Sequence, residues 1–322
     1  MSDTDQDLQI TSPKNQIQLF GYEYYFNSFI KLYQENNLPN TILLSGPKGI
    51  GKATFAYHFI NYVLSINEDN AYSVNNFTIN PNNKSYRNLC QDIHPNFLLL
   101  DNDDTSENIK IENVRNTLKF LSKSAYSKNI KIILIDNAEY LNIHSSNALL
   151  KTLEEANNKT FFFIIHNNLC KILNTIKSRC IEFKFIISMP EKKRILENII
   201  KQYKDDFVIK KIDENFYFDT PGNIIRYLLI LNNNKIDTLK DKKSIILHLF
   251  NKYKLNNNQE ILTFISLLIE LFYNDLSIKN NNNLSFYFSN KLKLLKQIDD
   301  MKKFNLDKKN LFVSLQKTLQ DE

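Results

Sequence analysis

The stretch TILLSGPKGIGKATF, residues 41–55, decides the fold class of this chain. Its first five residues form a short apolar run of the kind that fills a buried β-strand. The next seven have the form G-x-x-x-x-G-K, and apolar residues at helical spacing follow them. A loop of this form between a strand and a helix binds phosphate, because its backbone N–H groups surround the anion and its lysine neutralises the charge. The sequence therefore predicts a phosphate-binding loop (P-loop) with Gly46, Gly49, Gly51 and Lys52 as contact residues.

Four further short apolar runs follow this stretch along the chain. Segments with helical spacing separate them, such as 114–121 and 145–153. Continuous apolar runs suit strands that are buried on both faces, as in parallel sheets. The alternation predicts a parallel α/β domain with helices on both faces of the sheet. The four runs are residues 97–100, 131–135, 161–165 and 181–185.

The strand pattern ends near residue 187, and helical periodicity continues to the C-terminus. Pro190 stands where the first of these helices begins, a position at which proline is common. We therefore expect one P-loop domain followed by two helical domains. The expected boundaries are 1–16 for a polar tail, 17–187 for the P-loop domain, 188–233 for a small helical lid and 234–322 for an all-helical C-terminal domain.

Charge and composition narrow the class of protein. The net charge of 41 − 35 = +6 permits contact with nucleic acid but does not require it, because such binding needs a local basic patch. The three cysteines, Cys90, Cys170 and Cys180, have no C-x-x-C spacing, which fits a reducing cytosol without a disulfide framework. The N-terminus lacks the pattern of a secretion signal, and the longest apolar stretch, residues 261–273, falls short of a membrane span. We expect a soluble, cytoplasmic protein without membrane contact.

Two groups that ATP hydrolysis requires are missing from their expected positions. The residue after the P-loop lysine normally carries a hydroxyl that binds Mg²⁺, and here it is Ala53. Asp136 ends a strand at the sheet edge where ligands bind, and we include it in a degenerate nucleotide site. The next residue, usually a glutamate acting as general base, is Asn137, whose amide cannot accept the proton. We interpret Glu139 as a helix-start or surface residue. Hydrolysis is not expected, and binding of ATP without turnover stays open.

Six strings in a fixed order carry a resemblance to a known family. They are LFGYEYY (19–25), NNLPNTILLSGPKGIGKAT (36–54), DIHPNFLLL (92–100), IKIENVRNTLKFLSKSA (109–125), IKIILIDNAEYLNIHSSNALLKTLEE (130–155) and FFFIIHNNLCKILNTIKSRC (161–180). Together they resemble the delta-prime subunits of the bacterial DNA polymerase III clamp loader, within the AAA+ group. The resemblance is dense over 17–185 and weak over 186–230. It implies an AAA+ P-loop sheet domain, a helical lid and an all-helical collar that holds a ring of subunits.

The string Ser178-Arg179-Cys180 is the most specific part of this resemblance. In the family, its arginine projects across a subunit boundary toward ATP that the neighbouring subunit holds. A planar, permanently charged guanidinium suits this task, since it stabilises charge that develops on the γ-phosphate. The resemblance thus implies that Arg179 acts in trans as an arginine finger and that the chain has no catalytic residue in cis. The alternative is that Arg179 only pairs with a surface carboxylate.

Other family positions are altered in this chain. His166 and Asn167 match a sensor position at the end of a strand, and we expect them to form hydrogen bonds there. The second sensor position, usually arginine, holds Asn223. Many relatives carry a zinc module with four cysteines, whereas the matching segment supplies only Cys90 and His94. We therefore expect neither zinc nor another metal.

The preferred interpretation is a non-catalytic, stator-like subunit of the DNA polymerase III clamp loader. It would dock beside gamma/tau and delta subunits, supply Arg179, and help to load the sliding clamp onto primed DNA. A second interpretation is an ATP-hydrolysing, gamma/tau-like motor subunit, which would need the two missing groups. A third is a small-molecule P-loop kinase, which explains neither the Ser-Arg-Cys string nor the helical C-terminal third.

Overall fold

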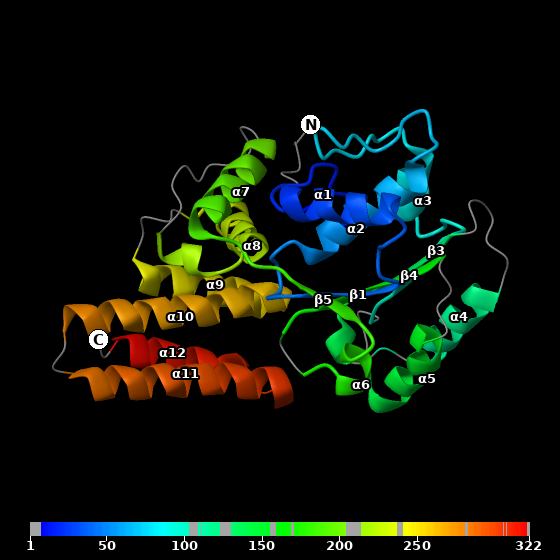
Figure 1. The fold of residues 1–322 in the computed structure, drawn as a ribbon. Helices are drawn as coiled ribbons and strands as arrows, with labels where there is room; N and C mark the ends of the chain where they lie inside the picture. Colours follow the sequence, from blue (N-terminus) through cyan, green and yellow to red (C-terminus); the bar gives the residue numbers. More distant parts are fainter. Residues whose placement is uncertain are drawn as a thin grey trace, which may run out of the picture. The chain divides into compact units, whose positions relative to one another are not determined.

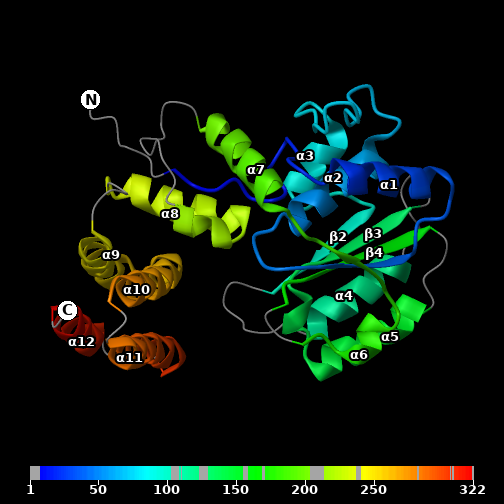
Figure 2. The same cartoon turned by 60° about the vertical axis from the view of Figure 1, so that its left-hand side comes forward.

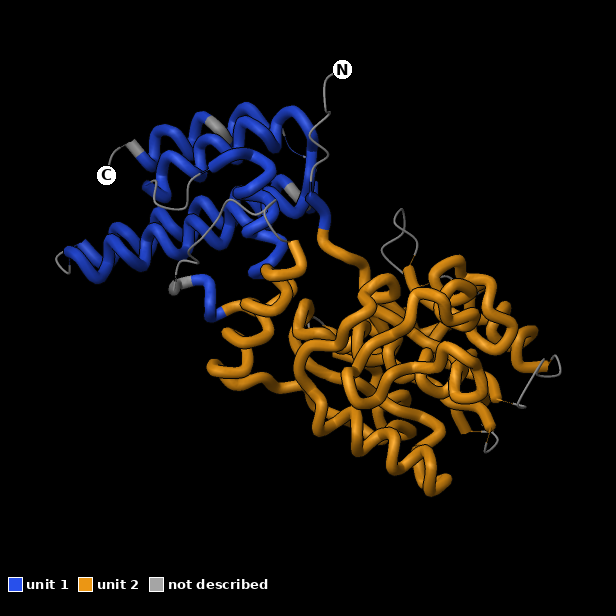
Figure 3. The backbone as a smooth tube through the Cα atoms, turned by 90° about the horizontal axis from the view of Figure 1, so that it is seen from above, with its two compact units in different colours: residues 1–9, 204–218, 224–322 blue, residues 10–203, 219–223 orange. Residues whose placement is uncertain are grey.

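The computed structural model forms two compact units, which Figure 3 colours separately. The P-loop unit comprises residues 10–203 and 219–223, and the helical unit comprises residues 1–9, 204–218 and 224–322. The three-part division expected from the sequence remains a prediction. The structure describes residues 8–102, 109, 111–122, 130–154, 159–168, 171–203, 214–236, 241–280, 283–304, 306 and 308–320.

A five-stranded parallel sheet forms the centre of the P-loop unit. Its strands lie in the order β2-β3-β4-β1-β5, and Ile42 of β1 pairs with both Phe163 of β4 and Ile181 of β5. This confirms the parallel sheet predicted from the apolar runs. Because all strands run the same way, their carboxyl ends meet at one edge of the sheet. The strands are β1 (Thr41–Ser45), β2 (Phe97–Leu100), β3 (Lys131–Ile135), β4 (Thr160–His166) and β5 (Ile181–Lys184).

Successive residues of each strand face opposite sides of the sheet, so a sheet that is covered on both faces needs unbroken apolar runs. In β1, Ile42 and Leu44 belong to one buried cluster and Leu43 belongs to the other. Helices cover both faces, as predicted and as Figure 1 shows. They are α1 (Glu23–Gln34), α2 (Lys52–Ser65) and α3 (Lys84–Cys90) on the first face, and α4 (Ile111–Ser122), α5 (Ile143–Glu154) and α6 (Asn174–Lys177) on the second.

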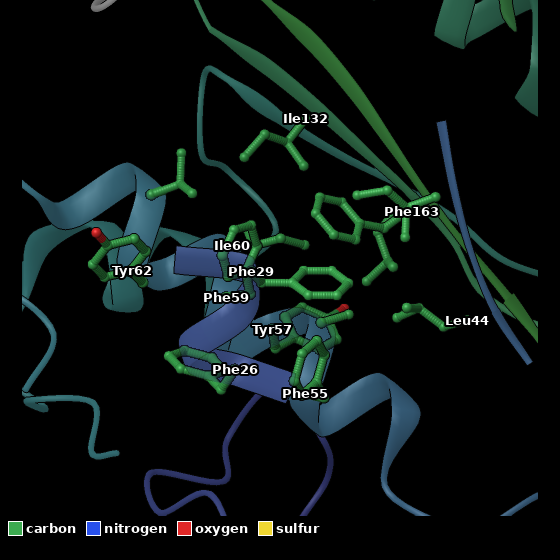
Figure 4. Close-up of a cluster of buried hydrophobic side chains, with 14 of the residues drawn as sticks. Phe26, Phe29, Leu44, Phe55, Tyr57, Phe59, Ile60, Tyr62, Ile132 and Phe163 are labelled. Atoms are coloured by element: carbon green, nitrogen blue, oxygen red, sulfur yellow. The ribbon is translucent and has the colours of Figure 1, made fainter. Parts of the chain in front are cut away.

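Aromatic side chains dominate the core on the first face (Figure 4). Phe26 and Phe29 of α1 meet Phe55 and Phe59 of α2 edge to face, with ring centroids 5.1 to 6.0 Å apart. Phe59 also contacts Phe163 of β4, at a centroid distance of 5.8 Å. Such pairs contribute about 0.5–1.5 kcal/mol each beyond the area that they bury. This cluster anchors α2, the helix that begins at the end of the P-loop.

The last helix of the P-loop unit is α7 (Met189–Gln202). The Ser188 side chain accepts a hydrogen bond from the Glu191 backbone N–H and caps this helix, and Pro190 lies in the first turn. The helix start predicted from Pro190 is confirmed.

In the part of the helical unit that the structure describes, all regular elements are helices. Figure 2 looks nearly along α9 to α12, which lie side by side. Within this group α10 contacts both α9 and α11, and α12 contacts α9 and α11. The elements are the 3₁₀ helix η3 (Glu214–Phe218), α8 (Pro221–Asn233), α9 (Lys242–Asn256), α10 (Gln259–Lys279), α11 (Leu284–Phe304) and α12 (Lys308–Gln320), and the first three residues of α8 belong to the P-loop unit.

Helix α10 extends beyond the apolar stretch 261–273 noted in the sequence. Its 21 residues are long and apolar enough to cross a membrane, judged by length and composition alone. Several of its apolar side chains are buried against other helices. Phe264 is buried and stacks on Tyr227 of α8, with ring centroids 4.6 Å apart and planes at 9°. Leu262 and Leu268 are buried as well. This packing is that of the central helix of a helical bundle.

Candidate functional site

The predicted P-loop leads from β1 into α2, as the sequence required. Gly49 and Gly51 have φ angles of +82° and +106°, a backbone conformation that favours glycine. Space also excludes a side chain at Gly49, since a Cβ there would come within 2.5 Å of Thr220 Oγ1. Both glycines therefore permit the turn of the loop, and Gly49 also leaves room for the segment 219–223.

The P-loop lysine is folded back onto its own loop. Lys52 is buried, and its Nζ donates to the carbonyl oxygens of Gly46 and Pro47, both at 2.8 Å. An ammonium group has three protons, so these two bonds leave one for a phosphate. Burial lowers the pKa of Lys52 to about 8, while the carboxylates of Asp136 and Glu139 favour the charged form.

Three consecutive carbonyl groups of the P-loop accept hydrogen bonds from other parts of the same unit. The bonds run from Thr220 Oγ1 to Lys48 O (2.8 Å), from Gly222 N to Gly49 O (2.9 Å) and from Tyr22 Oη to Ile50 O (3.0 Å). We call the donors Tyr22, Thr220 and Gly222 the clasp. The C=O and N–H of one trans peptide point in opposite directions, so the clasp fixes how the loop presents its N–H groups. Sequence analysis identified none of the three donors.

The second sensor position holds the neutral residue Asn223, so it presents no charge to the P-loop. Asn223 Nδ2 donates to Asp219 Oδ1 at 2.9 Å, within the same turn. Lys192 Nζ donates to the Asp219 carbonyl at 2.7 Å and ties this turn to α7. Arg226, one helical turn later, forms an ion pair with Glu260 of the helical unit, at 3.6 Å.

A polar network fills the carboxyl edge of the sheet at the ends of β2, β3 and β4. The amide of Asn137 donates to Asp101 Oδ1 at 2.9 Å and accepts from Asn167 Nδ2 at 2.8 Å. Both ends of this side chain are therefore engaged, and an amide has no basic lone pair to accept a proton from water. The hydrogen bonding expected for Asn167 at the end of β4 is confirmed.

Glu139 lies at the start of a short helix, as the sequence predicted, and it also belongs to this network. The helix is the 3₁₀ helix η1 (Ala138–Tyr140), and the Glu139 carboxylate accepts from the backbone N–H and the Nδ2 of Asn167, at 3.2 and 2.9 Å. The positions of Glu139 and Asn167 in the sequence were compatible with this contact. Both residues closely follow the ends of neighbouring strands, and such ends meet in a parallel sheet.

Among the carboxylates of this edge, Asp136 has the pKa that differs most from its ordinary value. Burial, and then the negative charge of Asp101, raise its pKa to about 6, while a backbone hydrogen bond from Asn137 and the ammonium of Lys52 act in the opposite direction. The predicted residues Lys52 and Asp136 are thus close enough to interact electrostatically, as a nucleotide site would require.

The Ser-Arg-Cys string wraps the end of the short helix α6. The Ser178 hydroxyl and the Arg179 Nη1 both donate to the Thr175 carbonyl, at 3.2 and 2.8 Å. The Cys180 thiol donates to the Ile176 carbonyl at 3.1 Å, and burial raises the pKa of this thiol to about 12, which makes it unreactive. The last carbonyl groups of a helix have no hydrogen-bond donor within the helix. The side chains of Ser178, Arg179 and Cys180 supply such donors at the end of α6.

Arg179 also binds a carboxylate of its own chain. Its Nε donates to Glu154 Oε1 at 2.7 Å, and its Nη2 donates to the same oxygen. The alternative of a pairing with a surface carboxylate is therefore present in this structure. The pairing and an action in trans are compatible, because a guanidinium has five N–H groups.

Arg179 lies at the opposite edge of the sheet from the P-loop. It is two residues before Ile181, which pairs with Ile42 near the start of β1, whereas Gly46 follows the end of β1. The separation along the strands is about six residues, or roughly 20 Å. No side chain spans that distance, so Arg179 does not serve the P-loop of its own chain.

The segment that corresponds to the zinc module is organised by hydrogen bonds. His94 Nδ1 accepts from the Asn96 backbone N–H at 3.2 Å, and Cys90 Sγ donates to the Lys14 carbonyl at 3.5 Å. The Glu68 carboxylate accepts from the hydroxyl of Ser85 at 2.6 Å and from backbone N–H groups at the start of α3. In the part of the chain that the structure describes, no three His, Cys, Asp or Glu side chains gather as a metal site would require. Cys170 lies outside the described residues.

These features define a class of protein. A parallel sheet in the order β2-β3-β4-β1-β5, with a P-loop after β1 and an acidic residue after β3, is the core of an AAA+ P-loop protein. The family described as "DNA polymerase III, delta subunit" matches residues 22–188, which is half of the chain. The chain belongs to the DNA polymerase III delta-prime family of clamp-loader AAA+ proteins.

Individual relatives are similar over part of their length. The DNA polymerase III subunit delta' of Pseudomonas aeruginosa is 31% identical over 44% of this chain and 41% of its own. The subunit gamma of Buchnera aphidicola subsp. Schizaphis graminum is 28% identical over 70% of this chain and 61% of its own. The chain thus spans about half the length of these curated relatives. A gamma subunit-related protein of Thermotoga maritima aligns over 91% of this chain and 97% of its own, with 15% identity and a TM-score of 0.48.

Proposed function

We propose that this chain is a non-catalytic subunit of a cytoplasmic DNA polymerase III clamp loader. In this proposal it docks beside gamma/tau and delta subunits and supplies Arg179 to the ATP site of a neighbour. The assembly then loads the sliding clamp onto primed DNA. The relatives named delta' and gamma support such partners, and family membership leaves the small-molecule kinase interpretation without support.

The observation that carries the non-catalytic role is the state of Asn137. Its amide is engaged at both ends, by Asp101 and Asn167, at the point where a general base would stand. Ala53, in addition, offers a methyl group where a hydroxyl would bind Mg²⁺. Two groups that act in the same reaction are thus both absent. Loss of a general base alone typically costs ~10²–10⁴-fold in rate.

The clasp supports a stator-like role. In a motor subunit the lid has to respond to the nucleotide, whereas here Thr220 and Gly222 of the turn 219–223 donate hydrogen bonds directly to the P-loop carbonyls. A lid turn that is held by its own chain gives the P-loop unit one fixed arrangement. A fixed arrangement suits a subunit that offers a surface to its neighbours.

The position of Arg179 supports its action in trans. The backbone of Arg179 is roughly 20 Å along the strands from its own P-loop, which is beyond the reach of the side chain, so the guanidinium can serve only the P-loop of another molecule. A planar guanidinium beside a γ-phosphate stabilises the charge of the transition state, and such an arginine is worth roughly 10³–10⁵-fold at the site that it serves.

One observation favours a second function, that of a gamma/tau-like motor. Glu139 supplies a carboxylate at the sheet edge, two residues beyond the usual position of the base. Subunits named gamma are also among the relatives. The two functions differ in a direct measurement: a motor hydrolyses ATP by itself, and Lys52→Ala abolishes that turnover.

The test uses the isolated chain and a complex reconstituted with gamma and delta subunits. We expect the isolated chain to release no phosphate above the buffer rate. We expect Arg179→Ala to leave assembly intact by gel filtration and to depress the ATPase that clamp and DNA stimulate. Arg179→Lys should rescue poorly, because a point charge does not reproduce the planar fork. If Arg179→Ala complexes assemble normally and load clamps at the wild-type rate, the proposed role of Arg179 is wrong.

A further inference from the structure

The guanidinium of Arg179 is held on two sides by its own chain. Glu154, the last residue of α5, accepts from Nε at 2.7 Å and from Nη2, and the Thr175 carbonyl accepts from Nη1 at 2.8 Å. Both acceptors stabilise a cation, since one is a negatively charged carboxylate and the other is a carbonyl oxygen of the short helix α6.

These contacts leave part of the guanidinium unused. Of its five N–H groups, Nε uses one, Nη1 uses one and Nη2 uses one. One N–H therefore remains on each of the two terminal nitrogens. We call the N–H groups that remain on Nη1 and Nη2 the fork, because a guanidinium that turns its two terminal nitrogens toward a phosphate can donate to two of its oxygens. About a third of the side chain is exposed, so this fork has access to another molecule.

We propose that Glu154 is a positioning residue for Arg179. It orients the guanidinium through Nε and Nη2 so that the fork on the terminal nitrogens meets the γ-phosphate of a nucleotide on the neighbouring subunit. This inference rests on the proposed function and adds a residue to the same site. Glu154 does not touch the nucleotide and acts through Arg179 alone.

The physical advantage is that the arginine is ordered before the subunits meet. A free arginine side chain samples many rotamers, and fixing them during the reaction would reduce the benefit of the charge. The carboxylate performs this ordering in the separate chain. We expect its loss to lower turnover at the neighbouring site by about 3- to 30-fold, far less than loss of the arginine itself.

A competing role for the same ion pair predicts the opposite effect of its loss on the rate of ATP hydrolysis. If Glu154 held Arg179 away from the nucleotide, each docking event would have to break the ion pair, and removal of the carboxylate would raise the rate. Glutamine separates the effects of geometry and charge. Its amide oxygen still accepts from Nε and Nη2, so Glu154→Gln keeps the orientation, whereas Glu154→Ala loses it.

The experiment measures ATP hydrolysis stimulated by clamp and primed DNA in complexes that contain the full chain with Glu154→Ala, Glu154→Gln or Glu112→Ala. Glu112→Ala is the matched control, because it removes an exposed carboxylate from α4. We expect Glu154→Ala to lower the part of kcat that depends on Arg179, which is the wild-type value minus the Arg179→Ala value, by about 3- to 30-fold with a smaller change in KM. Glu154→Gln and Glu112→Ala should stay within about 2-fold of the wild type. In an Arg179→Ala background, Glu154→Ala should have no further effect. A rate for Glu154→Ala at or above the wild type, or an equal loss in the Arg179→Ala background, would overturn the proposal.

A second measurement, on the isolated chain, separates this inference from the proposed function. The Nε–H signal of Arg179 in ¹⁵N NMR spectra should exchange slowly with water in the wild type and rapidly after Glu154→Ala. Unchanged exchange would mean that Glu154 does not hold the guanidinium and would overturn the inference, whatever the complex does. If exchange responds but Arg179→Ala leaves the ATPase of the complex intact, the proposed function fails and the positioning role in trans fails with it.

Discussion

At the scale of single residues, the two edges of the sheet use polar side chains in different ways. At the carboxyl edge, Asn137 satisfies hydrogen bonds at a position where catalysis would need a basic carboxylate. At the opposite edge, Ser178, Arg179 and Cys180 all donate to the final carbonyls of α6. The string therefore has a structural role in its own chain, and only the unused face of the guanidinium is available for chemistry.

Asp136 leads to a prediction about pH. Its pKa is raised to about 6 from an ordinary 3.8, so the folded chain binds this proton more tightly than the unfolded chain. The stability that this group contributes is therefore present below pH 3.8 and is lost as the pH rises through 6. Asp136→Asn cannot titrate and keeps an oxygen that accepts from the Asn137 N–H. Because Asp136 is only half-buried, solvent reduces the effect, and we expect the variant to be more stable than the wild type by about 1–2 kcal/mol at pH 8.

The measurement is the free energy of unfolding in urea, followed by far-ultraviolet circular dichroism because the chain has no Trp. The advantage of Asp136→Asn should shrink as the pH falls through 6 and disappear near pH 4. The difference between the two curves carries the test, since the two proteins share all other titrating groups. A difference that does not change between pH 8 and pH 4 would contradict the raised pKa.

At the scale of elements, the clasp joins three parts of the P-loop unit that are far apart in sequence. The start of α1, the P-loop and the start of α8 meet through Tyr22, Thr220 and Gly222. Gly222 has no room for a side chain, because a Cβ there would come within 2.8 Å of Gly49 O and 3.0 Å of Gly49 Cα. Both are backbone atoms of the loop, so neither can move aside as a flexible side chain would.

Substitution of Gly222 should therefore destabilise the P-loop unit. We expect Gly222→Ala to lower the free energy of unfolding by about 1–3 kcal/mol, the range for overpacked sites. Thr220→Val removes only the hydroxyl that binds Lys48 O and should cost about 1 kcal/mol. Urea denaturation of both variants measures these values. Wild-type stability for Gly222→Ala would mean that the turn 219–223 does not rest on the P-loop in solution.

At the scale of the whole molecule, the chain contains two units, each with its own buried core. The P-loop unit has the two clusters on its sheet, and the helical unit is built around α10. Phe264 of α10 is fully buried against Tyr227, whereas Ile278, near the end of the same helix, is 79% exposed. This pair of residues tests whether α10 is a core helix and whether the units are stabilised separately.

We expect Phe264→Ala to lower the free energy of unfolding of the helical unit by about 3–5 kcal/mol, because it leaves a large cavity. Ile278→Ala should change it by less than about 0.5 kcal/mol. Hydrogen exchange measured by mass spectrometry should show faster exchange in α8 to α12 of Phe264→Ala, with β1 to β5 unchanged. Equal acceleration in the sheet would show that the two units unfold as one.

Much of the fold could be predicted from the sequence because the decisive interactions are local. The strand 41–45, its glycine loop and the following helix are contiguous, and the apolar runs need burial on both faces whatever their neighbours are. The candidate residue Lys52 was found through its motif, Asp136 through its place at the end of an apolar strand, and Arg179 through the resemblance to a known family. The donors of the clasp were not, because Tyr22 and Thr220 are separated from the loop by long stretches of chain and belong to no motif.

By itself, the sequence determined the sheet, the P-loop and the absence of two groups needed for hydrolysis, since each depends on which residue type stands at one position of a contiguous pattern. Only the tertiary structure decided what these residues touch. It joined Glu139 to Asn167, closed the turn 219–223 onto Gly49, and placed Glu154 beside Arg179. Side-chain hydrogen bonds and ion pairs form between groups within a few ångströms, and the packing of helices on the sheet, not spacing along the chain, brings such groups together.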